Sequence, residues 1–62
     1  MLKYEYMVVY ALNNGFGRSQ IFREKEIESY DEVAELDDYL KRVNNIDKLF
    51  ITDFKLLRIY EE

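Results

Sequence analysis

Apolar and polar positions along the chain predict three strands and one helix. Residues 4–12 (YEYMVVYAL) are rich in aromatic and β-branched side chains, which is typical of a strand. Both alternate sets of side chains are apolar in its middle, so we expect a central strand covered on two faces. Residues 18–27 form a more polar strand, whose lysine and glutamates suit a sheet edge. Residues 48–60 form a third strand, with a break or bulge expected near Asp53.

The turn between the first two strands leaves their register open. Asn14-Gly15 favours a hairpin turn of primed type, because these residues adopt positive φ at low cost. A two-residue loop at this dipeptide places Val8 opposite Ile21, whereas a three-residue loop with a bulge places Val9 opposite Ile21. A shift of one residue exchanges the two faces of a strand. The sequence therefore does not say which sheet face the helix covers.

Residues 29–43 have the spacing of an amphipathic helix. Ser29 is a good N-cap, and Glu32 three residues later completes the pattern of a capping box. Asn44-Asn45 suits a left-handed C-cap, after which Ile46 can fold back on the last turn. The apolar stripe comprises Val33, Leu36, Leu40 and Val43.

The helix also has a charged outer face. We expect ion pairs four residues apart, Asp37 with Lys41 and Asp38 with Arg42. Residues 24–38 hold eight acids and one lysine. This block could imitate nucleic-acid phosphates for a partner, but a solvated helix face is the favoured interpretation. Three outer acids are candidate interface residues: Asp31, Glu35 and Asp38.

The element order β-β-α-β predicts a single α+β domain spanning residues 1–62. A right-handed crossover through the helix makes the third strand parallel to the second. The first strand then fits between them, antiparallel to both, in the order 2-1-3. One helix packs on one face of this three-stranded sheet.

One helix leaves the other sheet face bare, although hydrophobic residues make up 48% of the chain. Monomers rarely expose large apolar patches, so we expect a homodimer that packs sheet on sheet or exchanges strands. The alternative is a standing site for another macromolecule. Tyr4, Tyr6 and Tyr10 are further interface candidates, because tyrosines bury a large area and keep a polar tip.

Composition excludes most catalytic chemistry. The chain has no histidine and no cysteine, which argues against a zinc site and leaves a carboxylate-only site for a hard cation as the open alternative. The usual Ser/His/Asp and Cys/His nucleophile systems cannot be built. We assign no catalytic, cofactor-binding or metal-ligating residue and expect a protein that is not an enzyme. The net charge of −4 opposes nucleic-acid binding, which depends on neutralising phosphates. No signal peptide or membrane-spanning run is visible, which favours the cytoplasm and no membrane partner.

The run Tyr4 to Tyr10, the Gly15-Phe16-Gly17 turn, the helix and the ending ITDFKLL resemble small uncharacterised proteins encoded by phages and prophages of Gram-positive bacteria. This resemblance implies an accessory product in the host cytoplasm that binds and inhibits a host protein, including a defence protein. The alternatives are a small nucleic-acid-binding or regulatory module, and a structural subunit that docks into a larger phage assembly.

Overall fold

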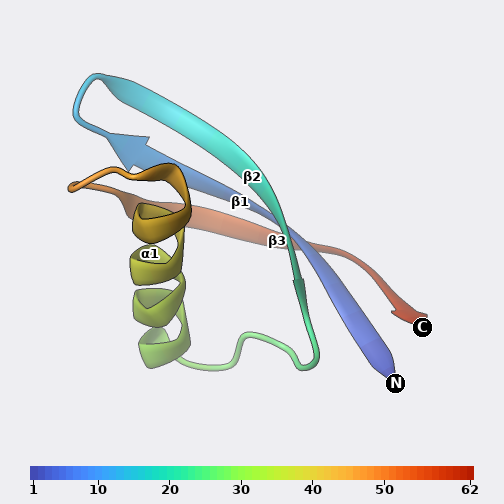
Figure 1. The fold of residues 1–62 in the computed structure, drawn as a ribbon. Coiled ribbons are helices and arrows are strands. Elements are labelled where there is room, and N and C mark those ends of the chain that lie inside the picture. The colour runs from blue at the N-terminus through green and yellow to red at the C-terminus, as the bar shows by residue number, and fades with distance from the viewer.

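The computed structural model describes all 62 residues and contains four elements. They are β1 (Leu2–Leu12), β2 (Gly15–Arg23), α1 (Tyr30–Asn44) and β3 (Phe50–Glu61). The sheet order is β2-β1-β3, and β1 is antiparallel to both neighbours. The helix lies on one side of the sheet (Figure 1). The N- and C-termini lie close together, at the end of the sheet that is far from the helix. The predicted α+β fold, strand order and edge position of β2 are confirmed.

The β1–β2 hairpin corrects both predicted registers. Leu12 pairs with Gly15, so the loop consists of Asn13 and Asn14, and Ile21 lies opposite Tyr6. Neither asparagine has positive φ, so the expected primed turn is also wrong. The register expected for a two-residue loop at Asn14-Gly15 differs from the observed one by two residues. It therefore predicted the correct face for Ile21, because the expected partner Val8 and the observed partner Tyr6 lie on the same face of β1.

Close packing of Tyr10 against Gly17 favours the observed hairpin register. These two residues are paired across the strands. A Cβ atom added to Gly17 would lie 2.3 Å from Cε1 of Tyr10, so the tyrosine ring occupies the space that any other side chain would need. The glycine therefore serves the packing of a core tyrosine.

β3 carries two irregularities in its pairing with β1. The register shifts where Val9 pairs with Asp53 and Tyr10 with Ile51, which confirms the bulge expected near Asp53. A second shift, which the sequence did not predict, separates the partners of Glu5 and Tyr6 and leaves Leu57 unpaired. Bulges increase local twist and change which residues of a strand share a face.

Both predicted helix caps are present. The Oγ atom of Ser29 accepts a hydrogen bond from the Glu32 backbone N–H at 3.4 Å. Asn45 is left-handed (φ 55°, ψ 49°), and the Ile46 N–H donates to the Lys41 carbonyl at 2.9 Å. These contacts satisfy backbone groups that the helix ends leave free.

The two ion pairs predicted within the helix are not formed. Asp37 Oδ1 accepts a hydrogen bond from the Ile51 backbone N–H at 2.8 Å, so this carboxylate fixes the start of β3 to the helix. Lys41 instead approaches Asp38, three residues earlier, at 3.9 Å. A long-range hydrogen bond to a half-buried backbone group outweighs an exposed pair on one helix.

The hydrophobic core lies between the helix and the sheet face that carries the even-numbered residues of β1. Its buried members are Tyr6, Val8, Tyr10, Ile21, Leu40 and Leu49. The Tyr6 hydroxyl accepts a hydrogen bond from the Ile27 N–H at 3.0 Å, and its ring meets Phe54 edge-on. Val43 was expected in the core stripe, but it is 60% exposed. Helix and sheet therefore do not close fully at the end of α1.

Candidate protein-interaction surfaces

A groove separates the C-terminal half of α1 from β2. It encloses about 500 Å³ and is lined by ten residues, six of them hydrophobic. The helix backbone approaches β3 and leaves a wider gap to β2. We call this depression the α1–β2 groove. The hydrophobic residues are Ile21 and Phe22 of β2 and Leu36, Tyr39, Leu40 and Val43 of α1.

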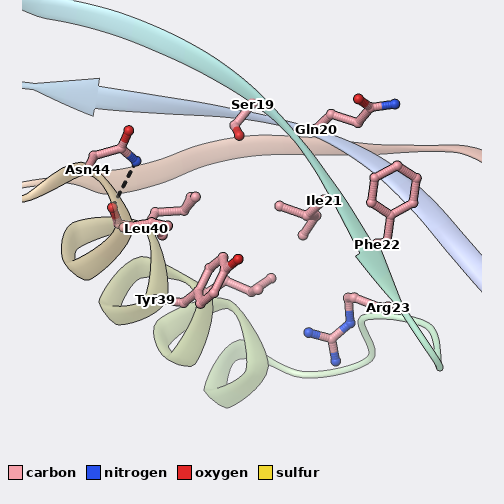
Figure 2. A pocket seen from close by; sticks show the side chains of 10 residues that line it. Ser19, Gln20, Ile21, Phe22, Arg23, Tyr39, Leu40 and Asn44 are labelled. Atoms are coloured by element: carbon pink, nitrogen blue, oxygen red, sulfur yellow. Dashed lines mark hydrogen bonds between the residues drawn. The ribbon is translucent and has the colours of Figure 1, made fainter.

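Figure 2 shows how the two elements face each other across the α1–β2 groove. Ile21 points from β2 toward the helix, and Leu40 and Tyr39 point back from α1, whereas Phe22 projects to the other side of β2 (Figure 2). The side chain of Asn44 is held against the helix by a hydrogen bond to the Leu40 carbonyl at 2.9 Å. β2 has a neighbour on only one side, so its outer edge borders the groove unpaired.

Arg23, which lines the α1–β2 groove, forms an ion pair with Glu32 of α1. Arg23 Nη2 donates to Glu32 Oε1 at 2.5 Å and Nε donates to the Lys25 carbonyl at 3.2 Å. The backbone N–H of Glu28 also donates to the Glu32 carboxylate, at 3.0 Å. That bond, with the charges of Lys25 and Arg23, lowers the pKa of Glu32 below its ordinary value. The end of β2 is thereby fixed to the first turn of α1.

The second surface is the sheet face that the helix does not cover, which we call the open face. It carries the odd-numbered residues of β1 from Lys3 to Ala11 and the even-numbered residues of β2 from Phe16 to Phe22. Their partners in β3 complete rows that run across the sheet. Large apolar side chains stand exposed here: Phe16, Phe22, Phe50 and Leu57.

Glu5 is the one buried charged residue, and it lies on the open face. Gln20 Nε2 donates to Glu5 Oε2 at 2.5 Å, and Arg58 Nε donates to Glu5 Oε1. The Arg58 guanidinium also stacks on the Tyr60 ring, 4.3 Å from its centroid. The hydrogen bonds from Arg58 and Gln20 lower the pKa of Glu5 and keep the carboxylate ionised.

No protein family, curated protein or solved structure matches this chain.

The candidate interface residues fall into two groups. Tyr6 and Tyr10 are 3% and 9% exposed, so they belong to the core and offer no surface to a partner in this fold. Tyr4 is half-buried against the same core. The remaining three candidates are exposed on α1, and they are Asp31, Glu35 and Asp38. The structure does not bring these acids together with the tyrosines.

Sequence reasoning missed the residues that shape the two surfaces. Tyr39 lies three residues after Leu36 and four before Val43, so this spacing marks a second apolar line on the helix, beside the core stripe. On the open face, the missed residues include Phe16 and Phe50, which lie on either side of Ala11. Finding that row required the hairpin register, which the sequence left open.

The structure holds no group of three or more acidic side chains arranged to bind a metal ion. Its helix is also too short and too polar to cross a membrane.

Proposed function

We propose that the protein is a non-enzymatic binding protein, which works as a homodimer and inhibits the protein that it binds. The observation that carries this proposal is the α1–β2 groove, where apolar side chains stay exposed beside an unpaired strand edge. Val43 and Tyr39 are 60% and 47% exposed there. Contiguous apolar patches of this kind mark binding sites for other proteins.

An extended segment of the partner fits the α1–β2 groove best. A strand laid along the free edge of β2 gains main-chain hydrogen bonds. Because side chains alternate along a strand, every second one would point toward the helix. There it would meet Leu36, Tyr39 and Val43, which line the groove without a covering element.

The resemblance to phage-encoded proteins supports a host protein as the partner and the host cytoplasm as the place of action. The absence of histidine and cysteine supports a role in binding, since the chain has no histidine general base and no cysteine nucleophile. The partner protein is inhibited because the segment held in the groove can no longer perform its own function.

Two tyrosines on the same helix give a matched test of the groove. Tyr39 lines the groove and Tyr30, 83% exposed, lies outside it. Tagged wild-type, Tyr39→Ala and Tyr30→Ala chains are incubated with lysate of a Gram-positive host, and bound proteins are quantified by mass spectrometry. We expect Tyr39→Ala to lose at least one protein that wild type and Tyr30→Ala retain, since truncating an interface tyrosine weakens binding by about tenfold or more.

Two outcomes would contradict this function. In one, wild type retrieves no protein above the level of an unrelated tagged control. In the other, Tyr39→Ala retrieves the same proteins in the same amounts as wild type, so the groove takes no part in capture.

A further inference from the structure

The open face carries two unpaired charges of opposite sign at equivalent places on either side of β1. Val9 pairs with Arg18 of β2 on one side and with Asp53 of β3 on the other. Both charged side chains are exposed, and neither forms an ion pair within the chain. Two strand spacings, about 9.6 Å, keep them apart across the sheet.

We propose that the open face is the interface of the homodimer, an inference that rests on the dimer of the proposed function, and that the two-fold axis runs parallel to β1 just outside this face. Rotation about this axis lays one sheet face to face on the other and exchanges the places of β2 and β3. Arg18 of each copy then faces Asp53 of the other, and Val9 faces Val9. A two-fold interface must be self-complementary, and the row of Arg18, Val9 and Asp53 is so, because the contact between Arg18 and Asp53 forms twice in each dimer.

The neighbouring rows fit the same axis. Ala11 pairs with Phe16 and with Phe50, so each exposed phenylalanine lies over a phenylalanine of the second copy, across a small central residue. Glu5 pairs with Phe22 and with Arg58, which brings the guanidinium of one copy to the Phe22 ring of the other. Aligned sheets pack about 10 Å apart with their strands crossing at about 30°, an angle that a small tilt of the axis provides.

The same axis brings Glu5 opposite Glu5 of the second copy, and each of these carboxylates is neutralised by the Arg58 of its own chain. A buried carboxylate is costly when it has no partner, but Glu5 already accepts hydrogen bonds from Gln20 and Arg58. Glu5 is 7% exposed in the single chain, so most of the desolvation of its carboxylate has taken place on folding. The Arg58 side chain is 62% exposed, so the water that the second copy must exclude lies mainly on the guanidinium.

The charges of the open face favour a second copy over a nucleic acid. Arg58 is paired with Glu5, and Lys3 lies 3.6 Å from Glu24 and 3.9 Å from Glu62. The cations of this face that form no ion pair are Arg18 and Lys55, and Asp53 offsets one of them, which leaves too small an excess of positive charge to track a phosphate backbone. The exposed phenylalanines therefore have no accompanying line of free cations.

Two charge-reversal variants test both the interface and its axis. In Arg18→Asp, the facing positions 18 and 53 are both acidic in the dimer, and in Asp53→Arg both are basic. Each variant alone should therefore dimerise about tenfold more weakly than wild type, because two attractive contacts become repulsive. When the two variants are mixed, both contacts of the heterodimer regain opposite charges. Sedimentation velocity should show a dimer in the mixture and monomers in the separate samples.

The mixed sample also controls for folding, since a misfolded variant could not recover association. An Asp47→Arg variant, which reverses an exposed acid in the loop between α1 and β3, should dimerise like wild type. A wild-type chain that stays monomeric at micromolar concentrations would overturn the proposal. Separate variants that dimerise like wild type, or a mixture no more dimeric than its parts, would also overturn it. A monomer that binds a labelled single-stranded oligonucleotide, with loss of binding in Phe16→Ala, would assign the face to nucleic acid instead.

Discussion

Val8 and Val9 are neighbours in β1, yet they belong to different environments. Val8 is fully buried between the sheet and the helix, whereas Val9 is half-buried on the open face. Both faces of β1 are apolar in the middle, so composition does not distinguish them. They differ in the residues that flank them on β2 and β3. The covered face meets the apolar residues of the core, whereas every row of the open face except that of Ala11 contains a charged side chain. An apolar strand face is therefore a core or an interface depending on its neighbours in the sheet.

A matched pair of leucines gives the largest expected difference between the two sides. Leu49 is fully buried beneath the covered face, and Leu57 is 48% exposed beside the open face. Leu49→Ala should lower the free energy of unfolding by about 2–5 kcal/mol, because it removes apolar contacts and leaves a cavity. Leu57→Ala should change the unfolding free energy of the monomer by no more than about 0.5 kcal/mol. Urea denaturation at low protein concentration measures both values, and equal losses would contradict the distinction between the faces.

Gly17 tests the covered face at the hairpin. Gly17→Ala should cost about 1–3 kcal/mol of unfolding free energy, because the new Cβ meets the Tyr10 ring and forces it to move. The same substitution should cost less in a Tyr10→Leu background, where the ring is gone. A double-mutant cycle followed by urea denaturation provides the comparison. If the cost is the same in both backgrounds, the tyrosine is not what requires glycine at this position.

The ionised Glu5 on the open face should make the free energy of unfolding depend on pH, and we expect this effect to be the smallest of the three. The hydrogen bonds from Arg58 and Gln20 lower the pKa of Glu5 in the folded protein below the ordinary value of 4.5. The unfolded chain therefore binds the proton more readily, and stability is lost as the pH falls through the folded-state pKa. Glu5→Gln should lose less stability than wild type on acidification below about pH 4.5, as measured by urea denaturation at several pH values.

A Glu35→Gln variant supplies the control for that pH experiment. Glu35 is exposed on α1 and forms no ion pair. The Glu35→Gln variant should therefore lose as much unfolding free energy on acidification as wild type does. Parallel profiles for wild type and Glu5→Gln would show that the network on the open face does not stabilise the fold.

The features that sequence predicted are those set by local pattern and chain direction. The caps at Ser29 and Asn45 depend on residues a few positions apart, and both were expected. The strand order followed from the right-handed crossover and from the apolar middle of β1. In each case the physical cause lies within one element or in the connection between two.

The features that sequence missed depend on contacts between distant residues. The Tyr10 ring over Gly17 favours the observed hairpin register, and no turn rule for Asn14-Gly15 contains that contact. Asp37 could not be separated from a surface acid until Ile51 was seen to donate to it. The tyrosines Tyr6 and Tyr10 suited an interface by residue type, but the helix covers their face of β1.

The most direct test of the account follows the methyl groups of Val8 and Val9 by NMR as the protein is diluted. If the open face binds a second copy, the Val9 methyl resonances shift with concentration along a dimerisation curve. The Val8 methyl resonances stay near their positions, because the helix covers them in monomer and dimer alike. Equal shifts for both valines, or no concentration dependence for Val9, would contradict the assignment of one face to the core and the other to a second copy.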